Sequence, residues 1–457
     1  MKRQVLVGVY GPKDNHSISA TAEETLTTLD LINSQGHLVH GIGNAIGDLS
    51  ALGVYPTQIA VDLLIIAAHV QAADTRISRS TESQDTWTRE IKIVVPVSDA
   101  CVWSRAITVL ERCLNFLTGD VWKVQFRPRP DGHPYPVPKA TLPLASSFDS
   151  LSLFSGGLDS LIGTIDLIEK GANPLLISHV SEGAVSEAQT KCFDEIKSSY
   201  PKRKIERLRM WMGFSGLRIS SDIEKTTRAR SFLFFSLGIL VGSGLGLKNG
   251  FTLRVPENGL IALNVPMDPL RLGSHSTRTT HPFYIARWNG ILNLLGIKGK
   301  IENPYFDKTK GEMVKACANQ PLLRKLIPLS LSCSSPSKGR WRGGKAVEHC
   351  GYCLPCLIRR AAIRSGLGTN QDMTAYALKD LTGRPLKSDV AEGKQIRSFQ
   401  YAMERLRRNP QSAKFFIHLP GSLADESLSR QQKLADVYKR GMEEVDDLLN
   451  GVSTRAK

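Results

Sequence analysis

One short stretch, residues 151–160, constrains the fold of this chain more than any other. Residues 151–154 form an apolar run typical of a buried strand, and Gly156 and Gly157 follow it directly. From residue 158 to residue 170 apolar side chains recur every three or four positions, and Gly171 then ends the pattern. The stretch therefore predicts a strand, a glycine turn and a helix in immediate succession, which is a building unit of α/β folds.

The same turn has the chemistry of a phosphate-binding loop. Glycine has no Cβ, so backbone N–H groups can close around phosphate oxygens, and the helix N-terminus adds partial positive charge. Serine hydroxyls can donate hydrogen bonds to phosphate, and a carboxylate can hold Mg²⁺ that bridges phosphates. The predicted phosphate ligands are Ser155, Gly156, Gly157, Leu158, Asp159 and Ser160, with Asp159 as the Mg²⁺ ligand and Asp159 and Ser160 as catalytic residues. The alternative is an ordinary strand-to-helix turn.

The six residues of this turn, Ser-Gly-Gly-Leu-Asp-Ser, resemble the PP-loop of the N-type ATP pyrophosphatases. Members of that superfamily include GMP synthetase, asparagine synthetase, tRNA lysidine synthetase and the QueC family. The resemblance implies an adenine nucleotide alpha hydrolase-like fold that binds ATP and Mg²⁺. It also implies that ATP is cleaved between its α and β phosphates and that AMP passes to an acceptor oxygen.

Length and alternation predict three units in the chain of 457 residues. Residues 1–145 read as an α+β accessory domain, residues 146–370 as the ATP pyrophosphatase domain, and residues 371–457 as a helical extension. The central unit alternates between strands and helices, which predicts a doubly wound parallel sheet whose ligands lie beyond the carboxyl ends of the strands. After the first strand and helix, its strands are expected at 175–179, 205–210, 260–263 and 300–303, and its helices at 182–199, 224–242, 283–295 and 309–318.

Charge and cysteine content bear on partners and location. The formal net charge is +16, which suggests an anionic partner such as a nucleotide, a nucleic acid or an acidic protein. The longest uncharged run, residues 232–247, contains four glycines and is too short for a membrane span. Because no export signal is evident, the eight cysteines are expected to be reduced in a cytoplasmic protein.

Three further stretches are expected to line the ligand crevice, and one of them is the segment 256–259 (Pro-Glu-Asn-Gly), which precedes a predicted strand. Arg228 and Arg230 lie near the start of a predicted helix and are candidates to contact phosphate or carboxylate. The long polar stretch 264–282 is a candidate substrate loop, the alternative being a surface excursion. Within that stretch, Asp268 and His275 are guesses for a general base.

Three closely spaced cysteines predict a metal site. Cys350, Cys353 and Cys356 repeat at intervals of three residues, and thiolates at this spacing converge on one tetrahedral ion such as Zn²⁺. A closed structural site needs a fourth ligand. Cys333 is the first candidate and His349 the second, and an iron–sulfur cluster is a less favoured occupant.

The turn and the cysteines together resemble the QueC family, the cyano-deazaguanine synthases. The segment from Asn303 to Val314 is similar to the segment before that family's zinc site. The resemblance implies that Cys333, Cys350, Cys353 and Cys356 bind zinc, and that a 7-carboxy-7-deazaguanine is adenylated and passed to ammonia, giving an amide and then a nitrile. It covers residues 148–370, and the added domains resemble the long QueC-like form, QatC, of the Qat anti-phage defence system.

In that long form the acceptor is open to a second interpretation, because an amine on a partner protein from the same operon could replace ammonia. The rival function is an RNA-modifying PP-loop enzyme that thiolates or ligates a tRNA base, which the positive charge favours. A binding module without catalysis is a third alternative, which the intact turn disfavours.

Overall fold

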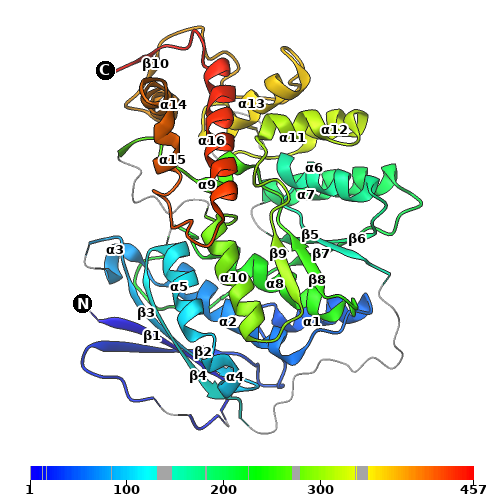
Figure 1. Cartoon of the computed structure of the whole chain (residues 1–457). Helices are drawn as coiled ribbons and strands as arrows, with labels where there is room; N and C mark the ends of the chain where they lie inside the picture. Colours follow the sequence, from blue (N-terminus) through cyan, green and yellow to red (C-terminus); the bar gives the residue numbers. More distant parts are fainter. Residues whose placement is uncertain are drawn as a thin grey trace.

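The described part of the computed structural model contains two large parallel sheets, a short parallel pair of strands and a cap of C-terminal helices (Figure 1). The structure describes residues 2–12, 14–16, 18–83, 85–130, 147–180, 183–224, 226–269, 278–334, 336 and 348–456. The first boundary predicted between units, at residue 145, lies outside these residues. The chain is therefore a mixed α/β protein, as its sequence predicts.

The N-terminal sheet has four strands in the order β2-β1-β3-β4. All three pairings within it are parallel, so the prediction of an α+β arrangement for residues 1–145 is wrong. Parallel pairing requires crossover connections of a dozen or more residues. Those between β2 and β3 and between β3 and β4 contain helices, whereas the described residues between β1 and β2 form none. The strands are β1 (Arg3–Val9), β2 (Glu24–Asp30), β3 (Glu90–Val97) and β4 (Val121–Pro128).

Five helices lie among the described residues of this first unit. Residues 100–118 form two helices rather than one, because Asp99 caps a short α4 through the Val102 N–H and a second helix begins only at Ile107. They are α1 (Ile42–Ala51), α2 (Gln58–Arg76), α3 (Arg79–Glu82), α4 (Ala100–Ser104) and α5 (Ile107–Thr118).

The second sheet has five parallel strands in the order β7-β6-β5-β8-β9. Residues of β6 alternate between two hydrophobic clusters: Leu175 and Ile177 pack with α8 and α10, whereas Leu176 packs with α6 and α7. Helices therefore cover both faces of this sheet. The elements are β5 (Ser150–Leu153), α6 (Leu158–Glu169), β6 (Pro174–His179), α7 (Gly183–Ser199), β7 (Glu206–Met210), α8 (Arg230–Gly244), β8 (Phe251–Arg254), α9 (Gly259–Leu263), α10 (Pro282–Leu294) and β9 (Gly299–Glu302).

Two expected elements of this sheet are misplaced in the sequence interpretation. The strand predicted at 260–263 is helix α9, because the Asn258 side chain accepts a hydrogen bond from the Ile261 N–H at 3.1 Å and caps a helix there. The fourth strand of the sheet is β8, which the sequence analysis missed. Helix α8 begins at Arg230 rather than at 224, because the segment before it binds the first unit: Arg79 donates to the Thr226 hydroxyl at 2.7 Å, and the Ala229 N–H donates to Asp74 at 2.8 Å.

The two sheets share one hydrophobic core. Helix α2 of the first unit packs against α8 of the second, and both helices are buried over most of their length. The cluster that contains them runs without interruption from Leu6 in β1 to Ile301 in β9. Although α2 and α8 are strongly apolar, no described helix is both long and apolar enough to cross a membrane.

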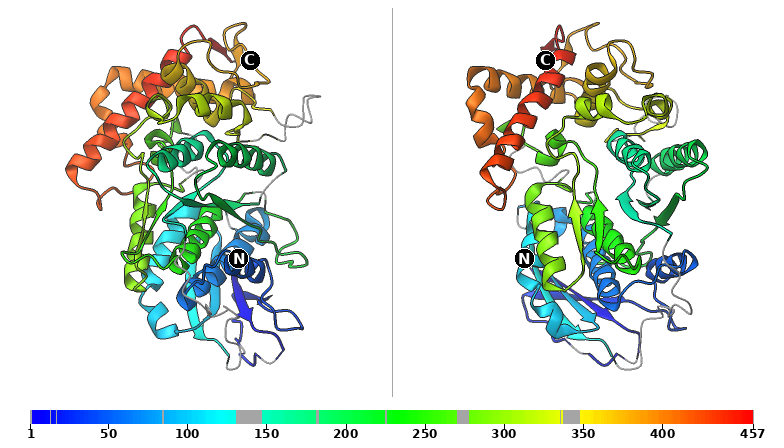
Figure 2. Two further views of the ribbon diagram at one scale, coloured as in Figure 1. Left: turned by 90° about the vertical axis from the view of Figure 1, so that its right-hand side faces the viewer. Right: turned by 45° about the vertical axis from the view of Figure 1, so that its right-hand side comes forward.

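A second core lies under the C-terminal helices, which form the upper part of the molecule (Figure 2). It joins α14 and α16 to α13 and α9, so the extension predicted for residues 371–457 packs on the central unit. The helices are α11 (Lys310–Ala316), α12 (Gln320–Leu326), α13 (Leu354–Leu367), α14 (Ala391–Arg408), α15 (Ala413–Phe416) and α16 (Leu428–Leu448), and a short parallel pair joins β10 (Leu386–Lys387) to β11 (Thr454–Arg455).

Candidate nucleotide site and metal centre

The turn between β5 and α6 has the strand, glycine turn and helix that the sequence predicts. Gly156 adopts φ +75°, and a Cβ on it would lie 3.1 Å from the backbone of Gln189, so only glycine fits without strain. The Ser160 hydroxyl donates to the Gly157 carbonyl at 2.9 Å and accepts from the Ser155 N–H at 3.3 Å. These hydrogen bonds of Ser155 and Ser160 therefore stabilise the conformation of the turn in the absence of a ligand.

The turn opens into a cavity of about 450 Å³ at the carboxyl ends of β5, β6 and β8. In the strand order, β5 and β8 are neighbours although the chain passes through β6 and β7 between them. Such a reversal leaves a crevice that ligands occupy in open α/β sheets. Apolar walls and a few polar groups line the cavity: Leu153, Phe154, Ser155, Ser160, Ile177, His179, Val185, Gln189, Arg230, Phe234, Val255, Pro256, Glu257, Thr279, Thr280, Leu331, Ser332 and Cys333.

Asp159 lies in a cluster of charged side chains beside this cavity. Its Oδ2 accepts a hydrogen bond from Asn258 Nδ2 at 2.8 Å and lies 3.3 Å from the Lys310 ammonium. Its Oδ1 is buried and has no hydrogen-bond partner among the described residues. Glu257 lies next to it, and burial together with the Asp159 carboxylate raises the pKa of Glu257 well above its usual value.

This arrangement fits a divalent cation. An orphaned buried carboxylate oxygen is costly unless something binds it, and two carboxylates whose charges repel are stabilised by a cation between them. Asp159 and Glu257 both line a smaller cavity of about 210 Å³ next to the turn, and Lys310 lines it too. Asp159, which the sequence predicts as the Mg²⁺ ligand, and Glu257, which the sequence places only in a stretch expected to line the crevice, are the side chains that would hold Mg²⁺.

Of the two arginines predicted to contact phosphate or carboxylate, only one lines the cavity. Arg230 lines the cavity. Arg228 is absent from the lining; its guanidinium donates to the Thr118 carbonyl at 3.0 Å and stacks 4.0 Å over the Trp87 ring, in the first unit. The expectation that Arg228 contacts a ligand in this cavity is therefore not supported, because its side chain is committed to the packing between the two sheets.

Two cavity residues were missed by the sequence analysis. His179 ends β6, and neither of its ring nitrogens has a hydrogen-bond partner within the described part of the chain; burial lowers its pKa to about 4. Gln189 on α7 is buried, and its Oε1 is also unsatisfied there. Position at the carboxyl end of a predicted strand was the signal that could have identified His179.

The guesses for a general base are not supported in the cavity. Asp268 accepts a hydrogen bond from the Ser398 hydroxyl of α14 and is not among the lining residues. His275 lies outside the described residues, as does the rest of the stretch 270–277. No general base is therefore assigned.

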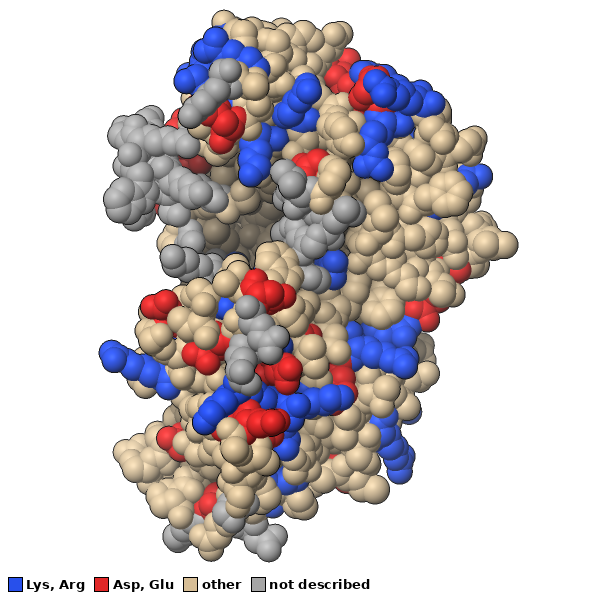
Figure 3. Space-filling view, turned by 90° about the vertical axis from the view of Figure 1, so that its left-hand side faces the viewer, with Lys and Arg blue, Asp and Glu red and all other residues tan. Residues whose placement is uncertain are grey.

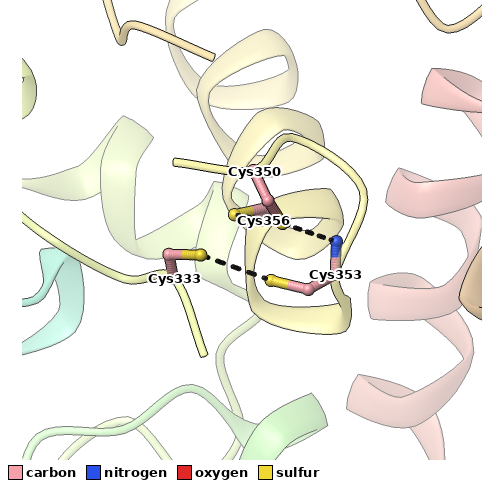
Figure 4. A group of neighbouring side chains, drawn as sticks. All are labelled: Cys333, Cys350, Cys353 and Cys356. Carbon is pink, nitrogen blue, oxygen red and sulfur yellow. Dashed lines mark hydrogen bonds between the residues drawn. The ribbon is translucent and has the colours of Figure 1, made fainter. Parts of the chain in front are cut away.

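The four cysteines predicted as metal ligands come together (Figure 4). Their Sγ atoms all lie within 4.8 Å of one another, and the pairs Cys333–Cys353 and Cys350–Cys356 are each 3.9 Å apart. Tetrahedral zinc with Zn–S bonds of about 2.3 Å needs sulfur atoms about 3.8 Å apart. Cys333, Cys350, Cys353 and Cys356 could thus hold a metal ion such as zinc.

His349 is not part of this cluster. Its Nε2 accepts a hydrogen bond from the Ser332 N–H at 3.1 Å, and its ring meets Tyr376 edge-on. Burial lowers its pKa to about 3, so the neutral ring that this hydrogen bond needs is the stable form. Of the two candidates for fourth ligand, the geometry favours Cys333.

The metal centre and the glycine turn are neighbours. Leu331 donates its N–H to the Gly156 carbonyl at 3.1 Å, and Cys333, two residues later, lines the cavity into which the turn opens. The segment that supplies the fourth sulfur therefore also forms one wall of the cavity.

Comparison with known proteins adds no identification: no family model matches this chain, and no curated protein matches it.

Proposed function

We propose that this protein is an ATP-dependent ligase that adenylates a carboxylate and transfers it to an amine. The observation that carries the proposal is the site at the carboxyl end of β5, where the glycine turn, Asp159 with its unsatisfied oxygen, Glu257 and Lys310 adjoin one cavity. The parallel strand order β7-β6-β5-β8-β9, with helices on both faces, supports the interpretation as a doubly wound, PP-loop-type sheet.

Leaving-group chemistry explains why such a site suits adenylation. A carboxylate is a poor acyl donor because it would have to expel hydroxide, whereas an acyl adenylate expels AMP, a stabilised anion. The enzyme must neutralise the negative charge on the departing pyrophosphate. Backbone N–H groups at the start of α6 and the Lys310 ammonium, which lies 3.3 Å from Asp159 Oδ2, could contribute to this, and Mg²⁺ held by Asp159 and Glu257 would supply further charge.

The substrate class follows from the resemblance to the QueC family. A 7-carboxy-7-deazaguanine is a flat heterocycle with a polar edge, and the cavity combines apolar walls with His179, Gln189 and Arg230. The acceptor is ammonia or an amine on a partner protein encoded nearby. In this proposal the protein acts in the cytoplasm in anti-phage defence, as the resemblance to QatC suggests.

An RNA-modifying PP-loop enzyme remains the second candidate because the net charge is +16. On the face shown in Figure 3, however, Lys and Arg lie among Asp and Glu and form no continuous basic belt. RNA readers concentrate basic side chains along the path of the backbone. RNA binding that weakens steeply as salt rises would favour this second candidate.

The decisive experiment is mass spectrometry of the products formed from ATP, Mg²⁺, ammonia and 7-carboxy-7-deazaguanine. We expect AMP, pyrophosphate and the deazaguanine amide or nitrile. In a second reaction the neighbouring operon protein replaces ammonia, and a mass increase on that protein identifies it as acceptor. The absence of AMP in both reactions would refute the ligase.

Asp159→Asn provides the matched test of the site. The amide retains the shape but loses the charge that holds Mg²⁺, so we expect pyrophosphate release to fall about 100-fold or more. Asp194→Asn, at an exposed position on α7, is the control and should retain the parent rate. Equal loss in both variants, or none in either, would contradict the role of Asp159.

A further inference from the structure

Lys310 is a buried cation of the candidate nucleotide site, and it begins a short helix, α11, that packs on α13. The residue is only 4% exposed and its ammonium lies 3.3 Å from Asp159 Oδ2. It is the first residue of α11, a helix of only seven residues. A short helix has little stability of its own, so the placement of Lys310 depends on what holds this helix end.

Helix α16 of the C-terminal extension contacts the N-terminal end of α11. One oxygen of Glu444 accepts the Thr309 hydroxyl, and the other accepts the Gly311 N–H at 3.1 Å. The two residues that flank Lys310 are thus held by a single carboxylate. Gly311 permits this contact, because a Cβ there would lie 2.3 Å from Glu444 Oε1.

A second contact from the same helix supports the first. Arg440, one turn before Glu444, donates to Glu312 Oε1 at 2.6 Å and to the Asp307 carbonyl at 2.9 Å. Glu312 in turn completes the capping box of α11 with Thr309. Helix α16 therefore contacts Asp307 and Thr309, which precede α11, and Gly311 and Glu312 in its first turn.

We propose that Glu444 is a positioning residue for the nucleotide site: by binding Thr309 and Gly311, it holds the Lys310 ammonium against Asp159. The C-terminal extension is then part of the machinery of the site, although no residue of α16 lines the cavities. The effect on catalysis rests on the proposed function, whereas the placement of Lys310 does not.

The first test reads the placement of Lys310 without any catalysis. The full chain is treated with formaldehyde and a hydride donor, and methylation of each lysine is followed by mass spectrometry of peptides. In Glu444→Ala we expect Lys310 to be methylated at least about fivefold faster than in the parent, since the ion pair with Asp159 loosens. Glu444→Gln, which keeps one acceptor oxygen, should be intermediate.

Glu443→Ala is the matched control, because Glu443 is the neighbouring residue on α16 and is exposed. It should leave Lys310 as protected as in the parent. Thermal unfolding checks that each variant is folded. If folded Glu444→Ala and Glu444→Gln both protect Lys310 fully, the positioning role is wrong.

The second test is a double-mutant cycle on pyrophosphate release. If Glu444 acts through Lys310, Glu444→Ala slows the parent but not the Lys310→Ala enzyme. Independent, multiplying losses would overturn the proposal, because they would show that Glu444 affects the reaction by another route. If the parent releases no pyrophosphate at all, the proposed function fails, and the methylation test still decides the placement of Lys310.

Discussion

His69 is a buried histidine held neutral by its surroundings. It has no exposed surface, its Nδ1 lies 2.8 Å from the Ile65 carbonyl, and its Nε2 has no partner among the described residues. Gly8 of β1 lets the ring approach, since a Cβ there would lie 2.3 Å from Nε2. Burial lowers the pKa of His69 to about 4, because an imidazolium would be poorly solvated at this position.

The lowered pKa of His69 predicts a loss of stability in acid. The unfolded chain binds a proton at His69 below a pH of about 6.5, whereas the folded chain does so only near pH 4. The contribution of neutral His69 to the free energy of unfolding is therefore fully present above a pH of about 6.5. It decreases as the pH falls, by about 3 kcal/mol in all. His69→Gln cannot be protonated and should show a shallower fall in urea unfolding between pH 6.5 and 4.5. His16→Gln, at an exposed site, should keep the parent slope, and equal slopes in all three proteins would contradict the argument.

At the scale of elements, the cysteine cluster joins α13 to the segment before it. Cys353 caps the helix and Cys356 lies in its first turn, whereas Cys333 comes from a separate segment that faces them in Figure 4. Arg359, farther along α13 and fully buried, donates to the Ser330 hydroxyl at 2.9 Å and to the Ile327 carbonyl at 2.6 Å. A bound ion would therefore add a second connection between α13 and the Cys333 segment, beside the hydrogen bonds of Arg359.

Removing one sulfur tests this link. Cys333→Ser should lose most of the bound zinc measured by metal analysis, because a hydroxyl is a much poorer ligand than a thiolate, and its unfolding temperature should fall. Because the Cys333 segment also contacts Gly156, we expect weaker nucleotide binding as well. Cys101→Ser, at an exposed cysteine, is the control. Full zinc content in Cys333→Ser would show that the fourth ligand is another group.

At the scale of the whole molecule, the shared core makes the two sheets one folding unit. Helix α2 lies against α8, and an uninterrupted apolar cluster connects β1 to β9. Separating the sheets would expose both of these buried helices to water. The cost of exposing such a surface is large, at about 25 cal/mol per Å² of apolar area, so the sheets should not unfold independently.

Calorimetry of the intact chain tests this coupling. We expect the N-terminal sheet and the five-stranded sheet to unfold in the same thermal transition. Leu64→Ala, in the fully buried part of α2, should cost about 2–5 kcal/mol and should lower the temperature at which α8 loses protection from hydrogen exchange. If α8 kept its protection while α2 lost it, the two sheets would be separate units.

The sequence predicted the local units of the site well. The glycine turn, the helix after it and the cysteine cluster were all found from spacing, because each depends on residues close together in the chain or on one repeated residue type. The errors came where a neighbour decides the structure. Residues 260–263 resemble a strand by composition, but the cap at Asn258 makes them a helix. Arg228 was predicted as a phosphate ligand, but its guanidinium binds the Thr118 carbonyl and stacks on Trp87.

The sequence alone determined the turn at Gly156 and the grouping of Cys350, Cys353 and Cys356, since both depend on residues close together in the chain. The preference for Cys333 over His349 as fourth ligand needed the tertiary structure. Only the tertiary structure decided what surrounds Asp159. Asn258 lies 99 residues from it in the chain, and Thr309 and Glu444 are 135 residues apart. No periodicity in the sequence relates such positions; they meet because the sheet order brings β5 beside β8 and because α16 packs over α11.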